Sequence, residues 1–131
     1  QWAIAPSLQG EDTISPLTAP GGRLHETRRA VIEACAQSKY LDVVAPRGAL
    51  YAFPSIRRAA LPAFDDDAFA LDLLEHENVL VVPGSGFNDS SNAHFRITLL
   101  PFADQMRDVF GRIERVLARS AAAGARARQV A

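Results

Sequence analysis

The chain has 131 residues, of which 48% are hydrophobic and 22% charged, and its formal net charge at pH 7 is −1. This length and composition predict a soluble domain with a single hydrophobic core. Because its arginines are interleaved with aspartates and glutamates, we expect no binding to nucleic acid or to an anionic membrane. No apolar run is long enough to span a bilayer, and the single cysteine, Cys35, favours a reducing, cytoplasmic setting.

Residues 1–21 are predicted to be a connecting helix and a linker. Gln1 to Gln9 are typical of the end of a helix, and prolines and glycines punctuate the segment from Gly10 to Gly22. The chain has thirteen arginines but one lysine, Lys39, and it starts with glutamine. We therefore expect it to be a piece of a larger protein, with the domain itself at residues 22–119.

The domain is predicted to begin with a helix that runs to about Ser38. Its apolar stripe consists of Leu24, Val31 and Cys35. Two short strands are expected next, at residues 41–45 and 49–53. The intervening Pro46-Arg47-Gly48 favours a turn, so these strands are predicted to form an antiparallel hairpin.

A second helix is predicted after an irregular loop at residues 54–64. It opens at Asp65-Asp66-Asp67 and ends near Glu77, and adjacent carboxylates at a helix start favour capping over a metal site. The histidines lack the spacing of metal ligands, so no metal is expected. The wholly apolar run at residues 79–82 is predicted to be the central strand, covered on both faces. The turn at residues 83–87 lacks the lysine of a phosphate-binding loop, although its backbone is suited to close approach by a ligand.

The segment from His94 to Pro101 contains the main candidate for ligand binding. The two-residue period of a strand places Phe95, Ile97 and Leu99 on one face and Arg96 on the other. A guanidinium needs water or an anion, and its planar fork suits a carboxylate. From the residues alone, Arg96 is equally consistent with a ligand contact and with a charge that protects a sheet edge.

The last helix is predicted from Pro101 to about Arg119. Its apolar stripe consists of Phe102, Met106, Val109, Phe110, Ile113 and Leu117. Residues 120–131, mostly alanine and arginine, are expected to be frayed or disordered. The order of elements predicts an α+β fold with a small, mixed, mostly antiparallel sheet covered mainly on one face by helices.

Four motifs occur in the order in which one known family carries them: Pro20-Gly21-Gly22-Arg23-Leu24, Gly48-Ala49-Leu50-Tyr51-Ala52-Phe53-Pro54, the segment from Leu73-Leu74 to Val82-Pro83-Gly84-Ser85-Gly86-Phe87-Asn88, and His94-Phe95-Arg96-Ile97. Over about Gln1 to Leu117 the chain resembles the C-terminal part of class I/II pyridoxal-phosphate aminotransferases, closest to the bacterial alanine aminotransferase-like branch. The resemblance implies a small α+β domain that closes over the substrate. Arg96 matches the family arginine that binds the substrate α-carboxylate.

The resemblance also implies an intact enzyme that transfers an amino group between an alanine-like L-amino acid and a 2-oxo acid such as pyruvate or 2-oxoglutarate. Lys39 does not match the motif of the Schiff-base lysine, so this chain is expected neither to hold pyridoxal 5'-phosphate nor to be active alone. The intact enzyme is expected to be a homodimer. The alternative is a stand-alone α+β module that binds a ligand or a partner without catalysis.

Overall fold

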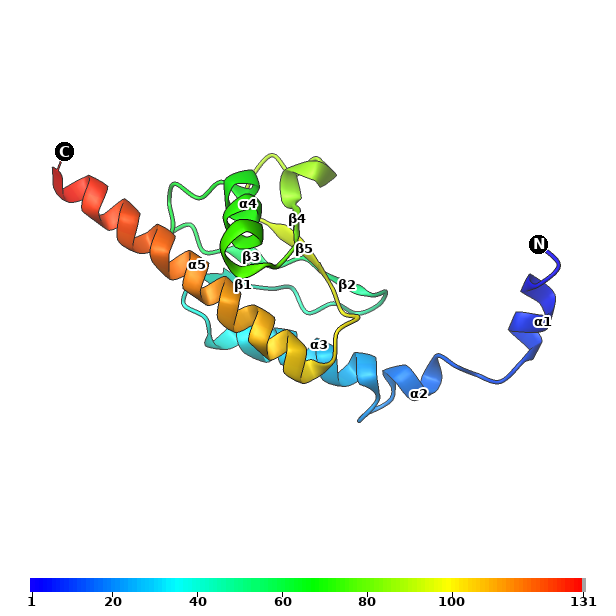
Figure 1. The fold of residues 1–131 in the computed structure, drawn as a ribbon. Coiled ribbons are helices and arrows are strands. Elements are labelled where there is room, and N and C mark those ends of the chain that lie inside the picture. Colours follow the sequence, from blue (N-terminus) through cyan, green and yellow to red (C-terminus); the bar gives the residue numbers. More distant parts are fainter. Residues whose placement is uncertain (131) are drawn as a thin grey trace.

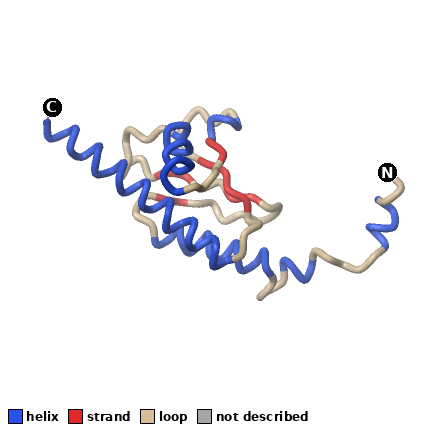
Figure 2. Tube along the Cα trace, viewed as in Figure 1, coloured by secondary structure: helices blue, strands red, loops and turns tan. Residues whose placement is uncertain are grey.

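A computed structural model describes the backbone of residues 1–130 and the side chains of residues 1–126; Ala131 lies outside the described residues (Figure 1). Three long helices form the body: α3 (Arg23–Gln37), α4 (Asp66–Glu77) and α5 (Ala103–Val130). The strands are short: β1 (Leu41–Asp42), β2 (Tyr51–Ala52), β3 (Ser55–Ile56), β4 (Val82–Pro83) and β5 (Phe95–Thr98). A 3₁₀ turn, η1 (Gly84–Phe87), follows β4, and two short helices precede the body, α1 (Ile4–Gln9) and α2 (Ser15–Thr18). Figure 2 shows how much of the chain is helix and loop compared with strand.

The body is organised around β5, the central strand of a three-stranded antiparallel sheet. The strand order is β2-β5-β4, and β1 pairs with β3 in a separate two-stranded sheet. Phe95, Ile97 and Leu99 are at most 6% exposed, as the two-residue period predicts. Side chains from α3, α4 and α5 pack in the same core. The predicted α+β fold with helices on one face is therefore confirmed.

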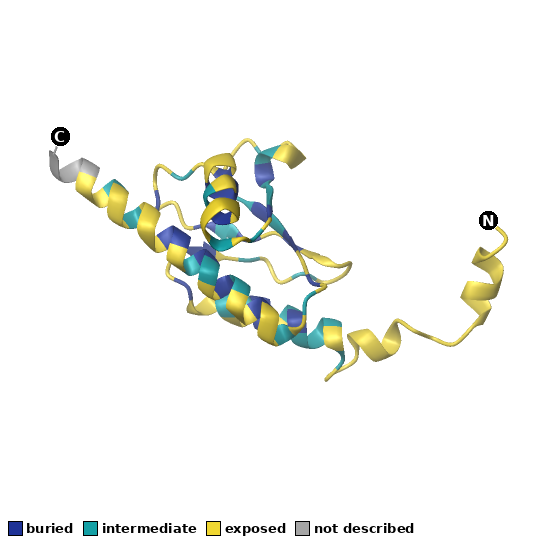
Figure 3. Cartoon of the chain, in the orientation of Figure 1, coloured by how far each residue is buried: buried dark blue, intermediate teal, exposed yellow. Residues whose placement is uncertain are grey.

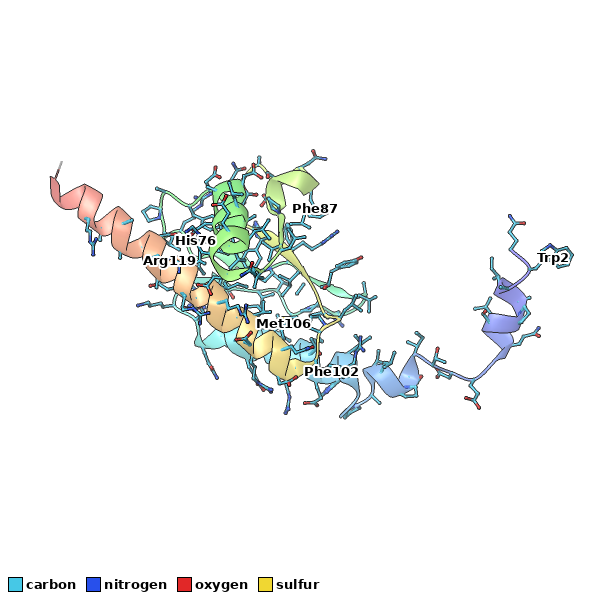
Figure 4. The ribbon with its side chains drawn as sticks, in the orientation of Figure 1. Trp2, His76, Phe87, Phe102, Met106 and Arg119 are labelled. Atoms are coloured by element: carbon cyan, nitrogen blue, oxygen red, sulfur yellow. The ribbon has the colours of Figure 1, made fainter. Side chains whose placement is uncertain are left out.

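Helix α5 supplies the longest apolar stripe of the core and packs against α3. Its buried residues are Met106, Phe110, Ile113, Val116 and Leu117. The hydroxyl of Thr27 in α3 donates to the carbonyl of Pro101 at 2.8 Å, which joins α3 to the start of α5. Phe102, predicted to belong to the stripe, is 56% exposed and lies instead against Arg23, with the guanidinium carbon 5.1 Å from the ring centre (Figure 4).

The predicted hairpin between residues 41–45 and 49–53 is wrong. Leu41 pairs with Ile56, so β1 joins β3, a strand that sequence reasoning placed inside an irregular loop. Val44 is 91% exposed, and the strand ends at Asp42. This pairing places two apolar side chains, Leu41 and Ile56, side by side in the core, and their burial favours it.

The prediction of a central strand at residues 79–82 is also wrong. Only Val82 and Pro83 pair with a neighbour, and β4 lies at the edge of its sheet. Leu80 is 77% exposed, whereas Val81 is buried. An apolar run does not reveal which strand is central, and Pro83 lacks the N–H that a second partner would require.

The two ends of the described chain extend from the body in different directions (Figure 1). The N-terminal arm, residues 1–19, carries α1 and α2 and has no buried residue (Figure 3). At the other end, α5 continues past Arg119, where a helix end was predicted, to Val130. Alanine and arginine are strong helix formers, so continuation needs no apolar stripe. The fraying expected of residues 120–131 in solution stays a prediction. Among the described residues, no helix is both long and apolar enough to cross a bilayer.

Candidate functional site

Arg96 lies on β5, on the face opposite the core. It pairs with Val82 of β4, and the flanking residues Phe95 and Ile97 point into the core. The side chain is half-buried. The sequence pattern thus places Arg96 outside the core, while the two neighbouring strands decide what surrounds it.

Two aromatic rings cover the Arg96 guanidinium. Its central carbon lies 4.7 Å from the ring centre of Tyr51 on β2 and 4.9 Å from that of Phe87 on η1. Both distances are within the range of cation–π attraction. Tyr51 pairs with Thr98, two residues along β5, so it shares the face of Arg96. Phe87 arrives from the opposite side, after β4, and Figure 4 shows it on the η1 turn.

The nitrogen atoms of Arg96 have no acceptor from the described part of the chain. Its Nε is buried without a hydrogen-bond partner. The two terminal nitrogens also lack a partner but are not among the buried unpaired atoms, so they reach solvent. No described carboxylate lies within salt-bridge distance of Arg96, although several other arginines are paired in this way. The site therefore presents a positive charge with unused donors.

The η1 turn that carries Phe87 is held by backbone contacts. A Cβ on Gly84 would lie 2.8 Å from the carbonyl oxygen of His94, so glycine permits the close approach of η1 to β5. The N–H of Gly84 donates to that carbonyl at 2.9 Å. The N–H of Ser85 donates to the carboxylate of Asp66 at 2.7 Å. A buried carboxylate at this turn disfavours phosphate, in agreement with the missing lysine.

Phe87 also contacts Phe53, which in turn stacks on His94, and the sequence analysis did not predict these contacts. The Phe53 ring meets Phe87 edge-on at 5.9 Å and stacks on His94 at 5.0 Å, with 5° between the planes. Nδ1 of His94 lies 2.6 Å from Asp89. The Ser91 hydroxyl and backbone, followed by His94, lower the pKa of Asp89. His94 and Phe53 both belong to the four motifs, in segments far apart in the sequence. The bridge between Ser55 and His94 brings these two segments together.

The other candidates have structural roles. Asp65 caps α4 by accepting the N–H of Ala68 at 2.8 Å, as predicted. Asp66 is instead fully buried against Ser85. Burial raises the pKa of the Cys35 thiol to about 12, which makes it an inert core residue. Within the described residues, no group of three histidine, cysteine or acidic side chains is arranged to bind a metal.

The surroundings of Lys39 differ from those that a cofactor-binding lysine requires. It is exposed between α3 and β1, and its ammonium lies 5.1 Å from the centre of the neighbouring Tyr40 ring. A lysine that forms a Schiff base needs a site that keeps its amine neutral. The exposed Lys39 side chain does not lie in such a site, so the described residues do not fit pyridoxal phosphate as a covalently held cofactor.

The family model for aminotransferase class I and II matches residues 1–113. The chain belongs to this family. Glutamate-pyruvate aminotransferase AlaA of Haemophilus influenzae is 38% identical over 117 residues, which cover 89% of this chain and 29% of the relative. An alanine aminotransferase of Mycobacterium tuberculosis is 39% identical over 88% of this chain and 26% of its own length. These matches confirm the resemblance that the four motifs indicated.

Solved aminotransferase structures share the fold of this chain. An aminotransferase from Escherichia coli superposes with a TM-score of 0.83 at 39% identity, covering 88% of this chain and 29% of that one. Alanine aminotransferase from Pyrococcus furiosus superposes with a TM-score of 0.66 at 31% identity, covering 74% of this chain and 24% of that one. This aminotransferase chain thus spans less than a third of the length of these relatives.

Proposed function

We propose that this chain forms the substrate-carboxylate site of an aminotransferase that exchanges an amino group between an alanine-like L-amino acid and a 2-oxo acid such as pyruvate or 2-oxoglutarate. One observation carries the proposal: the guanidinium carbon of Arg96 lies over the rings of Tyr51 and Phe87, while its terminal donors have no described acceptor. The names of the relatives support the alanine-like substrate.

The chemistry of the two substrates explains why one arginine serves both. An amino acid and its 2-oxo acid differ at Cα but share the adjacent carboxylate. Two parallel N–H···O bonds from a guanidinium hold that carboxylate in a defined plane. Fixing both oxygens also restricts the position of Cα, where the reaction takes place. The role of Arg96 is therefore to bind and orient, and the step at Cα belongs to other groups.

Members of this family generally depend on pyridoxal phosphate, which takes up the electron pair released at Cα when it is bound. Because Lys39 is unsuited to hold it, we propose that the cofactor lysine lies in another part of the protein. The homodimer and the cytoplasmic setting stay predictions.

Replacement of Arg96 by alanine in the complete aminotransferase tests this function. We expect kcat/KM to fall by roughly two to three decades for both L-alanine and pyruvate, since a bidentate charged pair in a closed site contributes about 2–5 kcal/mol. The melting temperature should stay unchanged, because the apolar face of β5 is untouched.

Arg23→Ala provides a matched control. Arg23 also lies against an aromatic ring, that of Phe102, and is exposed at the start of α3. Its replacement should leave kcat/KM for both substrates as in the wild type. If Arg96→Ala and Arg23→Ala behave alike, Arg96 does not bind the carboxylate.

A further inference from the structure

Tyr51 and Phe87 reach Arg96 from the two strands that flank β5. Tyr51 belongs to β2, on one side, and Phe87 follows β4, on the other. Both residues are partly exposed, at 46% and 45%, so their rings are not needed to fill the core. Their shared contact is the guanidinium. Packing alone does not explain why a half-buried arginine contacts two partly exposed rings from different elements.

We propose that Tyr51 and Phe87 are positioning residues, which hold the Arg96 guanidinium by its faces so that a carboxylate meets its two terminal nitrogens end-on. This inference rests on the proposed function of Arg96. In this proposal Tyr51 and Phe87 set the orientation of the Arg96 guanidinium, and the carboxylate binds at the edge formed by its two terminal nitrogens.

Aromatic rings can restrain an arginine side chain without using its N–H donors, whereas acidic side chains use these donors. An aromatic face attracts the cation through its quadrupole but does not occupy the N–H donors in the guanidinium plane. A neighbouring carboxylate would also restrain the side chain, yet it would use the same donors that the substrate needs. Without either restraint, a long arginine side chain would have to be ordered by the substrate itself.

The burial of Nε indicates which edge of the guanidinium is available. Because Nε is buried and the terminal nitrogens are not fully buried, we expect a carboxylate from solvent to approach Nη1 and Nη2. The end-on approach therefore follows from the packing around Arg96.

Phe87 is itself firmly supported, as a positioning residue must be. The η1 turn is joined to β5 through Gly84 and to α4 through the hydrogen bond from Ser85 to Asp66. The Phe53 ring contacts Phe87 edge-on. Tyr51 is held by its pairing with Thr98.

Kinetics of the complete aminotransferase with L-alanine and pyruvate test the inference. We expect Phe87→Leu and Tyr51→Leu each to lower kcat/KM by roughly 3- to 10-fold, between the values for an exposed and a desolvated cation–π contact, mainly through a higher KM. Phe87→Tyr and Tyr51→Phe, which keep the ring, should restore the wild-type value. Phe102→Leu, which removes the ring beside Arg23, should have no effect and serves as the control.

A double-mutant cycle separates positioning from direct contact with the substrate. If the rings act through Arg96, Phe87→Leu and Tyr51→Leu should cause no further loss in an Arg96→Ala background. Losses that multiply in that background, or single variants with wild-type kcat/KM, would overturn the inference. An unchanged kcat/KM in Arg96→Ala alone would instead overturn the proposed function, so the two failures are distinguishable.

Discussion

The arginines at the junction of α4 and α5 differ from Arg96 in what surrounds them. Arg115 and Arg119 contact the carboxylate of Glu77 at 2.6 and 3.1 Å, and Arg112 donates to the Glu77 carbonyl at 2.9 Å. Figure 4 labels Arg119 on α5, and its contact with Glu77 lies where α4 and α5 meet. At Arg96, aromatic rings restrain the side chain and its donors stay unused. The first group of arginines therefore joins two helices, whereas the donors of Arg96 are not used by the described residues.

Helix α4 connects these two regions. Near its start, Asp66 accepts the N–H of Ser85 in the turn that carries Phe87. At its end, Glu77 binds the arginines of α5. Variants at each end of α4 therefore test whether the two ends have separate roles.

The largest expected effect comes from exchanging arginine for lysine in each region. Arg96→Lys should lower kcat/KM of the complete enzyme by at least about tenfold, because an ammonium lacks both the planar fork and the flat face. Arg115→Lys should leave kcat/KM unchanged, since a lysine still pairs with Glu77. Steady-state kinetics with both substrates measure this difference, and equal losses in the two variants would remove the contrast between the regions.

A smaller effect is expected from Asp66→Ala, which removes the acceptor of the part-buried Ser85 N–H. A hydrogen bond to a carboxylate contributes about 1.5–3 kcal/mol, so the free energy of unfolding should fall by up to that amount in urea titrations. The neighbouring Asp67→Ala is the control, because Asp67 is exposed. If the two variants are equally stable, the hydrogen bond between Asp66 and Ser85 does not hold the turn.

The smallest effect is expected at Glu77 and depends on pH. Hydrogen bonds from Arg115 and then Arg119 lower the pKa of Glu77 from 4.5 to about 2. A lowered carboxylate pKa stabilises the folded state above pH 4.5, and this contribution is lost as the pH falls toward 2. Thermal melting should therefore show Glu77→Gln less stable than wild type at pH 6, with the difference vanishing near pH 2.

Glu75→Gln is the matched control for Glu77, since Glu75 is exposed on the same helix. Its melting temperature should follow that of the wild type at every pH. A constant difference between Glu77→Gln and wild type from pH 6 to pH 2 would contradict the role of the charge.

Local sequence patterns predicted the three long helices apart from the end of α5, the face of β5 that is buried, and the motifs that indicate the family. These features depend on local periodicity: the stripes of α3 and α5 repeat every three or four residues, and Phe95, Ile97 and Leu99 alternate with Arg96. Capping of α4 by Asp65 was likewise predictable, because the contact spans three residues.

The pairing of the strands and the surroundings of Arg96 depend instead on contacts between residues far apart in the sequence. The pairing of β1 with β3 and the edge position of β4 depend on which apolar side chains reach the common core, and short apolar runs do not encode this choice. Tyr51 and Phe87 are 45 and 9 residues away from Arg96 in the sequence. Their rings meet the guanidinium because β2 and β4 flank β5, a nonlocal arrangement that neither periodicity nor composition reveals.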